Sequence, residues 1–257
     1  MLFGGGSLPN RGLQRYCEWA GAKSARILVI TWASAYPDET FSGIRDRLSS
    51  FEPAAIEPAP KAEQLAEKKP ALFAQISRST GIFFSGGDQA NLVKLLARFP
   101  DVKAAIVARS EAGAVVAGTS AGTAILSRTI ISGETEEPAP YPSLYPYGVV
   151  LAEGLGLVSD AIVDQHFLQR PRLGRLLTAL EQSGQRTGLG IDENSAAGFD
   201  DGQVEVLGAG YAVWVRSEKA PRRFDVRIFA EGEKFELATG SALTPPASAA
   251  TDPPAGS

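Results

Sequence analysis

The chain has 257 residues, of which 44% are hydrophobic and 21% charged, and its formal net charge is −4 at pH 7. This length and apolar fraction suit a single α/β domain, and the acidic balance gives no reason to expect nucleic acid as a partner. Cys17 is the only cysteine and His166 the only histidine, so an internal disulfide and a zinc site of the usual ligands are both excluded. No segment approaches the roughly eighteen apolar residues of a membrane span. We therefore expect a cytoplasmic protein with no metal, no cofactor and no membrane partner. Glycines begin at position 4, so a missing upstream segment is an open alternative.

The first two thirds of the chain alternate short apolar runs with helical patterns. Runs typical of buried strands occupy residues 26–31, 81–84 and 114–117. Helical periodicity occupies residues 61–79, 89–98 and 102–112. This alternation predicts a parallel sheet with helices on both faces, and such sheets bind ligands outside the carboxyl ends of their strands.

The pattern changes after residue 186. Five short strand-like runs follow, at 188–192, 195–199, 203–207, 211–216 and 224–229. They predict an antiparallel extension of the sheet, so residues 1–243 are expected to form one domain. Residues 244–257 are rich in Pro, Ala, Ser and Gly, which predicts a disordered tail.

Residues 134–148 interrupt the alternation. This segment holds four prolines and three tyrosines, which is typical of a long loop. Long loops in compact domains are often lids or binding loops. We expect this one to border a site.

A serine lies between two glycines in Gly118-Thr119-Ser120-Ala121-Gly122. A strand precedes it and a helical pattern, Thr123 to Arg128, follows, which is the context of a nucleophile elbow. The Ser120 hydroxyl would then stand exposed at the strand end, and the Ala121 amide would be an oxyanion donor. In the alternative interpretation, the small residues only let a helix pack closely on the sheet.

A second glycine turn, Ser85-Gly86-Gly87-Asp88-Gln89, also ends a strand and opens a helix. Asp88 fits the N-cap position. In a parallel sheet both turns lie along one edge, so the Gly87 amide is a candidate second oxyanion donor. The alternative is a plain left-handed turn with a capping aspartate.

His166 closes an apolar run that begins at Asp160. Its ordinary pKa of about 6.5 suits a general base, which a serine nucleophile needs. A carboxylate should orient the ring. Glu193, which follows another strand end, is the first candidate, Asp164 is its rival and Asp192 is weaker. A lone histidine is otherwise more often a core or surface residue.

Three arginines, Arg170, Arg172 and Arg175, crowd the start of a helix near Pro171. Cations in a first helical turn oppose the helix dipole. An anionic ligand would explain them, because arginine binds carboxylates through two parallel hydrogen bonds. The alternative is a solvated basic face paired with acids from elsewhere.

Four of these motifs, in this order, resemble the cyanophycinase and peptidase E family of serine exopeptidases. They are residues 86–89, residues 118–122, residues 164–167 with the arginines that follow, and residues 190–193. The resemblance implies a flavodoxin-like sandwich of the class I glutamine amidotransferase type. It implies Ser120 as nucleophile, His166 as base, Glu193 as acid, and the amides of Gly87 and Ala121 as oxyanion donors.

The cyanophycinase branch implies further site residues and a substrate. The substrate-binding positions are Gln89, Gln165, Arg170, Arg172 and Arg175. Cyanophycinases cut a polyaspartate backbone whose side chains carry arginine, and they release β-Asp-Arg dipeptides. The resemblance therefore implies a serine peptidase, without a cofactor, that cuts aspartyl peptide bonds, and it implies a homodimer.

Three other functions stay open at this stage. A peptidase E-like enzyme would cut Asp-X or isoaspartyl dipeptides. An α/β-hydrolase esterase would need its acid before the histidine, which Glu193 argues against. A catalytically silent binding protein for anionic peptides would keep the same residues without turnover.

Overall fold

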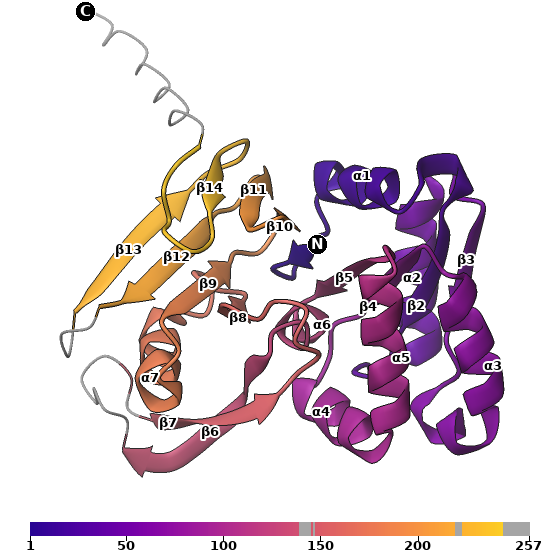
Figure 1. Ribbon diagram of the computed structural model, residues 1–257, viewed down its shortest axis with the longest axis horizontal. Coiled ribbons are helices and arrows are strands. Elements are labelled where there is room, and N and C mark those ends of the chain that lie inside the picture. Colours follow the sequence, from indigo (N-terminus) through magenta and orange to yellow (C-terminus); the bar gives the residue numbers. More distant parts are fainter. Residues whose placement is uncertain (139–144, 146, 219–222, 244–257) are drawn as a thin grey trace, which may run out of the picture.

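The computed structural model describes residues 1–138, 145, 147–218 and 223–243 (Figure 1). Within these ranges the larger sheet has eight strands in the order β14-β11-β10-β1-β5-β4-β2-β3. Its parallel strands are β1 (Leu2–Phe3), β2 (Arg26–Ile30), β3 (Ala55–Pro58), β4 (Gly81–Phe84) and β5 (Val115–Thr119). Its antiparallel strands are β10 (Ser195–Asp200), β11 (Gln203–Gly208) and β14 (Lys234–Glu236).

Helices cover both faces of the parallel strands. One face carries α1 (Asn10–Trp19) and α2 (Pro37–Ser49). The other carries α3 (Leu65–Arg78), α4 (Gln89–Arg98) and α5 (Pro100–Glu111). Ile27 and Leu28, neighbours on β2, pack into different core clusters because successive strand residues point to opposite faces. The predicted α/β sandwich with a mostly parallel sheet is confirmed.

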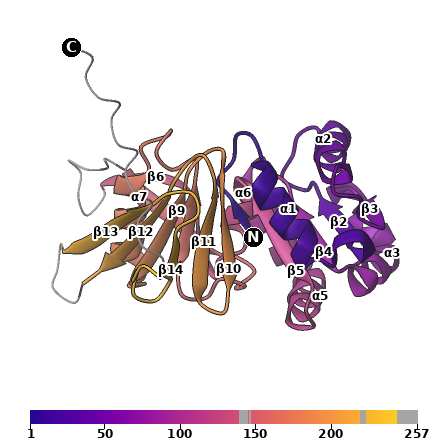
Figure 2. The same cartoon turned by 90° about the horizontal axis from the view of Figure 1, so that it is seen from above.

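A second, four-stranded sheet has the order β13-β12-β9-β8. Its strands are β8 (Ile162–Gln165), β9 (Thr187–Ile191), β12 (Ala212–Ser217) and β13 (Phe224–Phe229). The apolar face of α7 (Leu173–Ser183) packs on it through residues such as Leu176 and Leu180. Figure 2 shows this sheet at one end of the molecule and β2 and β3, with α2 and α3, at the other.

Two of the five predicted C-terminal runs, β10 and β11, form the predicted antiparallel extension, and β14, which the sequence does not predict, adds a third strand to it. The expectation that all five C-terminal runs extend one sheet is wrong for the other three, since β9, β12 and β13 belong to the second sheet. Residues 187–191 pair with β8 on one side and with β12 on the other. The strands that precede the predicted base and acid therefore lie in a different sheet from the strand that precedes Ser120.

The prediction of a loop over residues 134–148 is wrong at both ends of that segment. Strands β6 (Thr129–Pro138) and β7 (Tyr147–Glu153) form an antiparallel hairpin. Ile131 and Val149 of this hairpin are buried in the same apolar cluster as the leucines of α7. That burial favours strand pairing despite the prolines. Residues 139–144, and the tail predicted for 244–257, lie outside the described residues.

None of the helices in the described ranges is both long enough and apolar enough to cross a membrane.

Candidate active site

Ser120 occupies a sharp turn between β5 and the four-residue helix α6 (Ala121–Ala124). Its φ of 52° is rare for a residue with a side chain, and such backbone strain, which costs about 1–3 kcal/mol, clusters at functional sites. A Cβ at Gly118 would lie 1.9 Å from the Gly122 carbonyl oxygen, so the turn excludes larger residues there. The predicted helix over 123–128 is wrong in extent, because α6 ends at Ala124 and Ile125 caps it.

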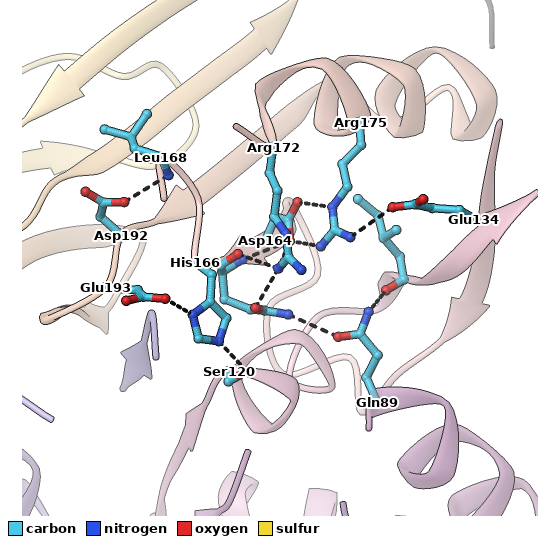
Figure 3. Close-up of polar contacts among 12 residues, drawn as sticks. Gln89, Ser120, Glu134, Asp164, His166, Leu168, Arg172, Arg175, Asp192 and Glu193 are labelled. Atoms are coloured by element: carbon cyan, nitrogen blue, oxygen red, sulfur yellow. Dashed lines mark hydrogen bonds and ion pairs between the residues drawn. The ribbon is translucent and has the colours of Figure 1, made fainter. Parts of the chain in front are cut away.

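His166 lies between Ser120 and Glu193 (Figure 3). Its Nδ1 is 2.5 Å from Glu193 Oε1, and its Nε2 is 2.7 Å from Ser120 Oγ. A carboxylate only accepts hydrogen bonds, so Nδ1 carries the proton and donates it to Glu193. Nε2 is then left to accept from the Ser120 hydroxyl, which is the arrangement that a general base requires.

Parallel pairing explains why the histidine meets the glutamate. Strands β8 and β9 are parallel neighbours with Gln165 opposite Ile191, so the residues that follow them leave the sheet at one edge. His166 comes directly after β8, and Glu193 is the second residue after β9.

Burial of the imidazole lowers the pKa of His166 below its ordinary 6.5, against the opposing effect of the Glu193 hydrogen bond. The nearby charges of Arg170 and Arg172 lower it further. The ring is therefore neutral at pH 7 and able to accept a proton.

The second glycine turn lies beside the serine. A Cβ at Gly86 would be 3.2 Å from Ser120 Cβ. Asp88 caps α4 by accepting from the Ala90 amide at 2.8 Å, as predicted. Within the part of the chain that the structure describes, the amides of Gly87 and Ala121 donate to no protein acceptor, so both have capacity for a ligand.

The two rival carboxylates lie elsewhere. Asp164 accepts from Arg175 Nε at 2.7 Å and from Arg175 Nη2 at 2.5 Å, and its side chain is only 2% exposed. Asp192 accepts from the Leu168 amide at 2.9 Å. Of the three candidate acids, Glu193 alone contacts the imidazole in the described structure.

Two predicted substrate residues, Gln89 and Gln165, form one hydrogen-bond chain with Arg172. Arg172 Nη1 donates to Gln165 Oε1 at 2.7 Å, and Gln165 Nε2 donates to Gln89 Oε1 at 3.0 Å. Gln89 in turn donates to the Ile131 carbonyl of the hairpin. Burial lowers the pKa of Arg172 to about 10, which leaves it charged at neutral pH.

The three arginines differ in exposure. The Arg175 side chain is 7% exposed and forms an ion pair with Asp164. Its Nη1 also lies 3.9 Å from Oε1 of Glu134 in the hairpin. The Arg172 side chain is 12% exposed, whereas Arg170 is an exposed residue. The helix begins at Leu173 rather than near Pro171, so Arg170 lies in the preceding loop. Substrate binding by these residues stays a prediction.

The sequence reasoning missed Gly5, which is buried against the His166 ring. The signal that could have indicated it is the run of three glycines directly after Leu2-Phe3. That strand has only two residues, too few to be recognised as a strand from the sequence. Among the described residues, no group of three or more His, Cys, Asp or Glu side chains could hold a metal ion.

An α/β sandwich with a Ser–His–carboxylate hydrogen-bond chain at its strand ends is typical of serine-type hydrolases. Residues 20–207 match the profile of Peptidase family S51. The chain belongs to this family of serine-type peptidases, that of the cyanophycinases and peptidase E.

Relatives support the same family. The chain is 36% identical to a cyanophycinase of Synechococcus elongatus over 214 residues, which are 82% of this chain and 65% of that protein. It is 38% identical to a cyanophycinase of Nostoc sp. over 206 residues, or 77% of this chain and 65% of that protein. The chain thus spans about two thirds of the length of these relatives.

Solved structures share the fold. A peptidase from an acI-B1 Actinobacterium superimposes with a TM-score of 0.68 at 21% identity, over 91% of this chain and 95% of that chain. A putative peptidase E protein from Listeria monocytogenes gives a TM-score of 0.51 at 16% identity, over 87% of this chain and 97% of that chain.

Proposed function

We propose that this chain is a serine peptidase that hydrolyses aspartyl peptide bonds, with residues 1–243 acting as one catalytic domain. The observation that carries the proposal is the continuous hydrogen-bond chain from Ser120 Oγ through the His166 imidazole to the Glu193 carboxylate. The strained backbone of Ser120 and the lowered pKa of His166 support it.

The proposed reaction follows from this geometry. His166 Nε2 takes the hydroxyl proton as Ser120 Oγ attacks the peptide carbonyl carbon. The amides of Gly87 and Ala121 stabilise the oxyanion that develops. The imidazolium, oriented by Glu193, then protonates the leaving amine. Water, deprotonated by His166, attacks the acyl-enzyme, releases a carboxylate product and restores Ser120.

Cyanophycin is the proposed substrate, with β-Asp-Arg dipeptides as products. The identity to cyanophycinases over most of this chain supports it. The charges around the site fit as well, because each repeat of the polymer carries a carboxylate and a guanidinium. Arg170 is exposed and can bind the carboxylate, while Glu134, 47% exposed and 3.9 Å from the Arg175 guanidinium, offers an acid for the substrate guanidinium.

The test is incubation of purified protein with cyanophycin, with products identified by mass spectrometry. The wild type and a surface control, Ser77→Ala, should both release β-Asp-Arg, and Ser120→Ala should release none. A fluorophosphonate probe should label Ser120 in the first two proteins only. Release that persists in Ser120→Ala would contradict the nucleophile assignment.

Two other results would redirect the proposal. Labelling without dipeptide release would keep the serine hydrolase and reject cyanophycin in favour of small Asp-X or isoaspartyl peptides. Neither labelling nor release from folded protein would reject the peptidase in favour of a binding protein for anionic peptides.

A further inference from the structure

Three consecutive backbone carbonyls near the N-terminus each hold one of the loops that carry the site. The Phe3 carbonyl accepts from the Ser120 amide at 3.1 Å, the Gly4 carbonyl from the His166 amide at 2.8 Å, and the Gly5 carbonyl from the Asn194 amide at 3.1 Å. Asn194 directly follows Glu193. One short segment therefore contacts the loops of the proposed nucleophile, base and acid in turn.

The three residues that donate to this segment share an unusual backbone. Ser120, His166 and Asn194 have φ values of 52°, 49° and 59°. Side chains disfavour this left-handed region, so such residues persist only where the surroundings hold them. The three loops follow β5, β8 and β9, which lie in two different sheets. Their common support is the segment of residues 3–5.

Gly5 also lies against the catalytic ring. A Cβ at this position would be 2.3 Å from His166 Cε1, 2.5 Å from Nε2 and 2.8 Å from Nδ1. Gly5 has a φ of +101°, which adds backbone strain to any substitution. A side chain here would displace the ring from both of its hydrogen-bond partners.

A side chain at Gly6 would be less crowded than one at Gly5, and its neighbours belong to the acid loop. A Cβ at Gly6 would lie 3.1 Å from Glu193 Oε2 and 3.1 Å from Asn194 Oδ1. The next residue, Ser7, donates its amide to Asn194 Oδ1 at 2.9 Å. The contact between the N-terminal segment and the acid loop thus continues beyond Gly5.

We propose that residues 3–6 are the template that positions Ser120, His166 and Glu193 relative to one another. Gly5 is a positioning residue in this arrangement, acting through His166. The inference rests on the proposed function, because it assumes that these three side chains form the catalytic triad.

The experiment exploits the single histidine of the chain. In tag-free protein the proton NMR signals of the ring belong to His166 alone, so its Nδ1–H signal and its titration can be followed without substrate. Gly5→Ala is compared with Gly43→Ala, a helical position where an added Cβ meets no atom within 4 Å. Circular dichroism and thermal melting check the fold, and a fluorophosphonate probe reports the reactivity of Ser120.

In folded Gly5→Ala, the hydrogen-bonded Nδ1–H signal should be lost and Ser120 labelling should slow by about 100-fold, the usual cost of misplacing a catalytic group by about 1 Å. Gly43→Ala should match the wild type. A folded Gly5→Ala protein with an unchanged ring signal and labelling rate would overturn the inference.

If Gly5→Ala does not fold, Gly6→Ala provides the test of the template. An altered His166 titration in folded Gly6→Ala supports the template, and an unchanged titration overturns it. Failure of the wild type to cut cyanophycin would count against the proposed substrate only, because the ring signal and the labelling do not depend on it.

Discussion

Asp164 of β8 and Arg175 of α7 form a buried bidentate pair. The two carboxylate oxygens accept from Arg175 Nε at 2.7 Å and from Nη2 at 2.5 Å, and both side chains are less than a tenth exposed. The pair joins β8 to α7, and Asp164 lies two residues before His166 in the chain. Its geometry gives Arg175 a structural role, whatever it contributes to a ligand.

Asp164→Ala should destabilise the protein by about 3–5 kcal/mol, because it leaves the buried Arg175 guanidinium without the carboxylate to which it is hydrogen-bonded. Urea unfolding measures the change. The matched control is Asp46→Ala, which removes an aspartate from an exposed pair with Arg45 and should cost at most about 1 kcal/mol. Equal losses in the two variants would show that the buried pair adds nothing beyond a surface pair.

Arg170→Ala should separate ligand binding from stability. Arg170 is exposed, so its loss should leave the unfolding free energy within about 0.5 kcal/mol of the wild type. A charge-assisted hydrogen bond to a substrate carboxylate is worth about 1.5–3 kcal/mol, so kcat/KM should fall by about 10- to 100-fold. Steady-state kinetics on cyanophycin test this, with the surface variant Arg45→Ala as control. An unchanged kcat/KM would remove Arg170 from the binding site.

Glu193→Gln tests the acid. The amide group of glutamine can donate to Nδ1, which would move the ring proton to Nε2 and prevent it from accepting from Ser120. We expect kcat to fall by about 10³- to 10⁴-fold, as for loss of the orienting carboxylate in other triads.

The stability of Glu193→Gln should match that of Glu231→Gln, an exposed control that pairs with Arg11 on the surface. Full activity in Glu193→Gln would reject Glu193 as the acid and return attention to Asp164.

The positions of Ser120, His166 and Glu193 could be predicted because each follows a local strand signal. In each case the functional residue lies within three residues of the end of a β-branched or apolar run. In α/β folds, ligand sites lie at the carboxyl ends of the parallel strands. The candidate residues could therefore be chosen without knowing which sheet each strand joins.

The features that could not be predicted from the sequence depend on contacts between segments that are distant in the chain. Strand β1 has two residues, too few to show any periodicity, yet Leu2 pairs with Gly118 on one side and with Ala197 on the other. The pairing of Arg175 with Asp164 depends on how α7 packs on β8. In the β6–β7 hairpin, the prolines and glutamates are typical of a loop. The burial of its apolar residues depends on their packing against α7, which the sequence does not show.

The pH dependence of the reaction should reflect the lowered pKa of His166. Activity requires the neutral ring, so kcat/KM should fall as the pH drops through a value below the ordinary 6.5 of histidine. Burial lowers this pKa most, the charges of Arg170 and Arg172 lower it further, and Glu193 opposes them. Titration of the His166 ring signal by NMR should give the same value as the acidic limb of the rate profile.

The same shift links pH to stability, with a sign that can be checked. The unfolded chain binds a proton on His166 at a higher pH than the folded chain does, since the folded pKa is lowered. The contribution of this group to stability is therefore present above pH 6.5 and is lost as the pH falls through the folded pKa. His166→Gln should remove this part of the pH dependence from urea unfolding measured between neutral and mildly acidic pH. A ring that titrates above 6.5 in the folded wild type would contradict both expectations, because the Glu193 hydrogen bond would then outweigh burial.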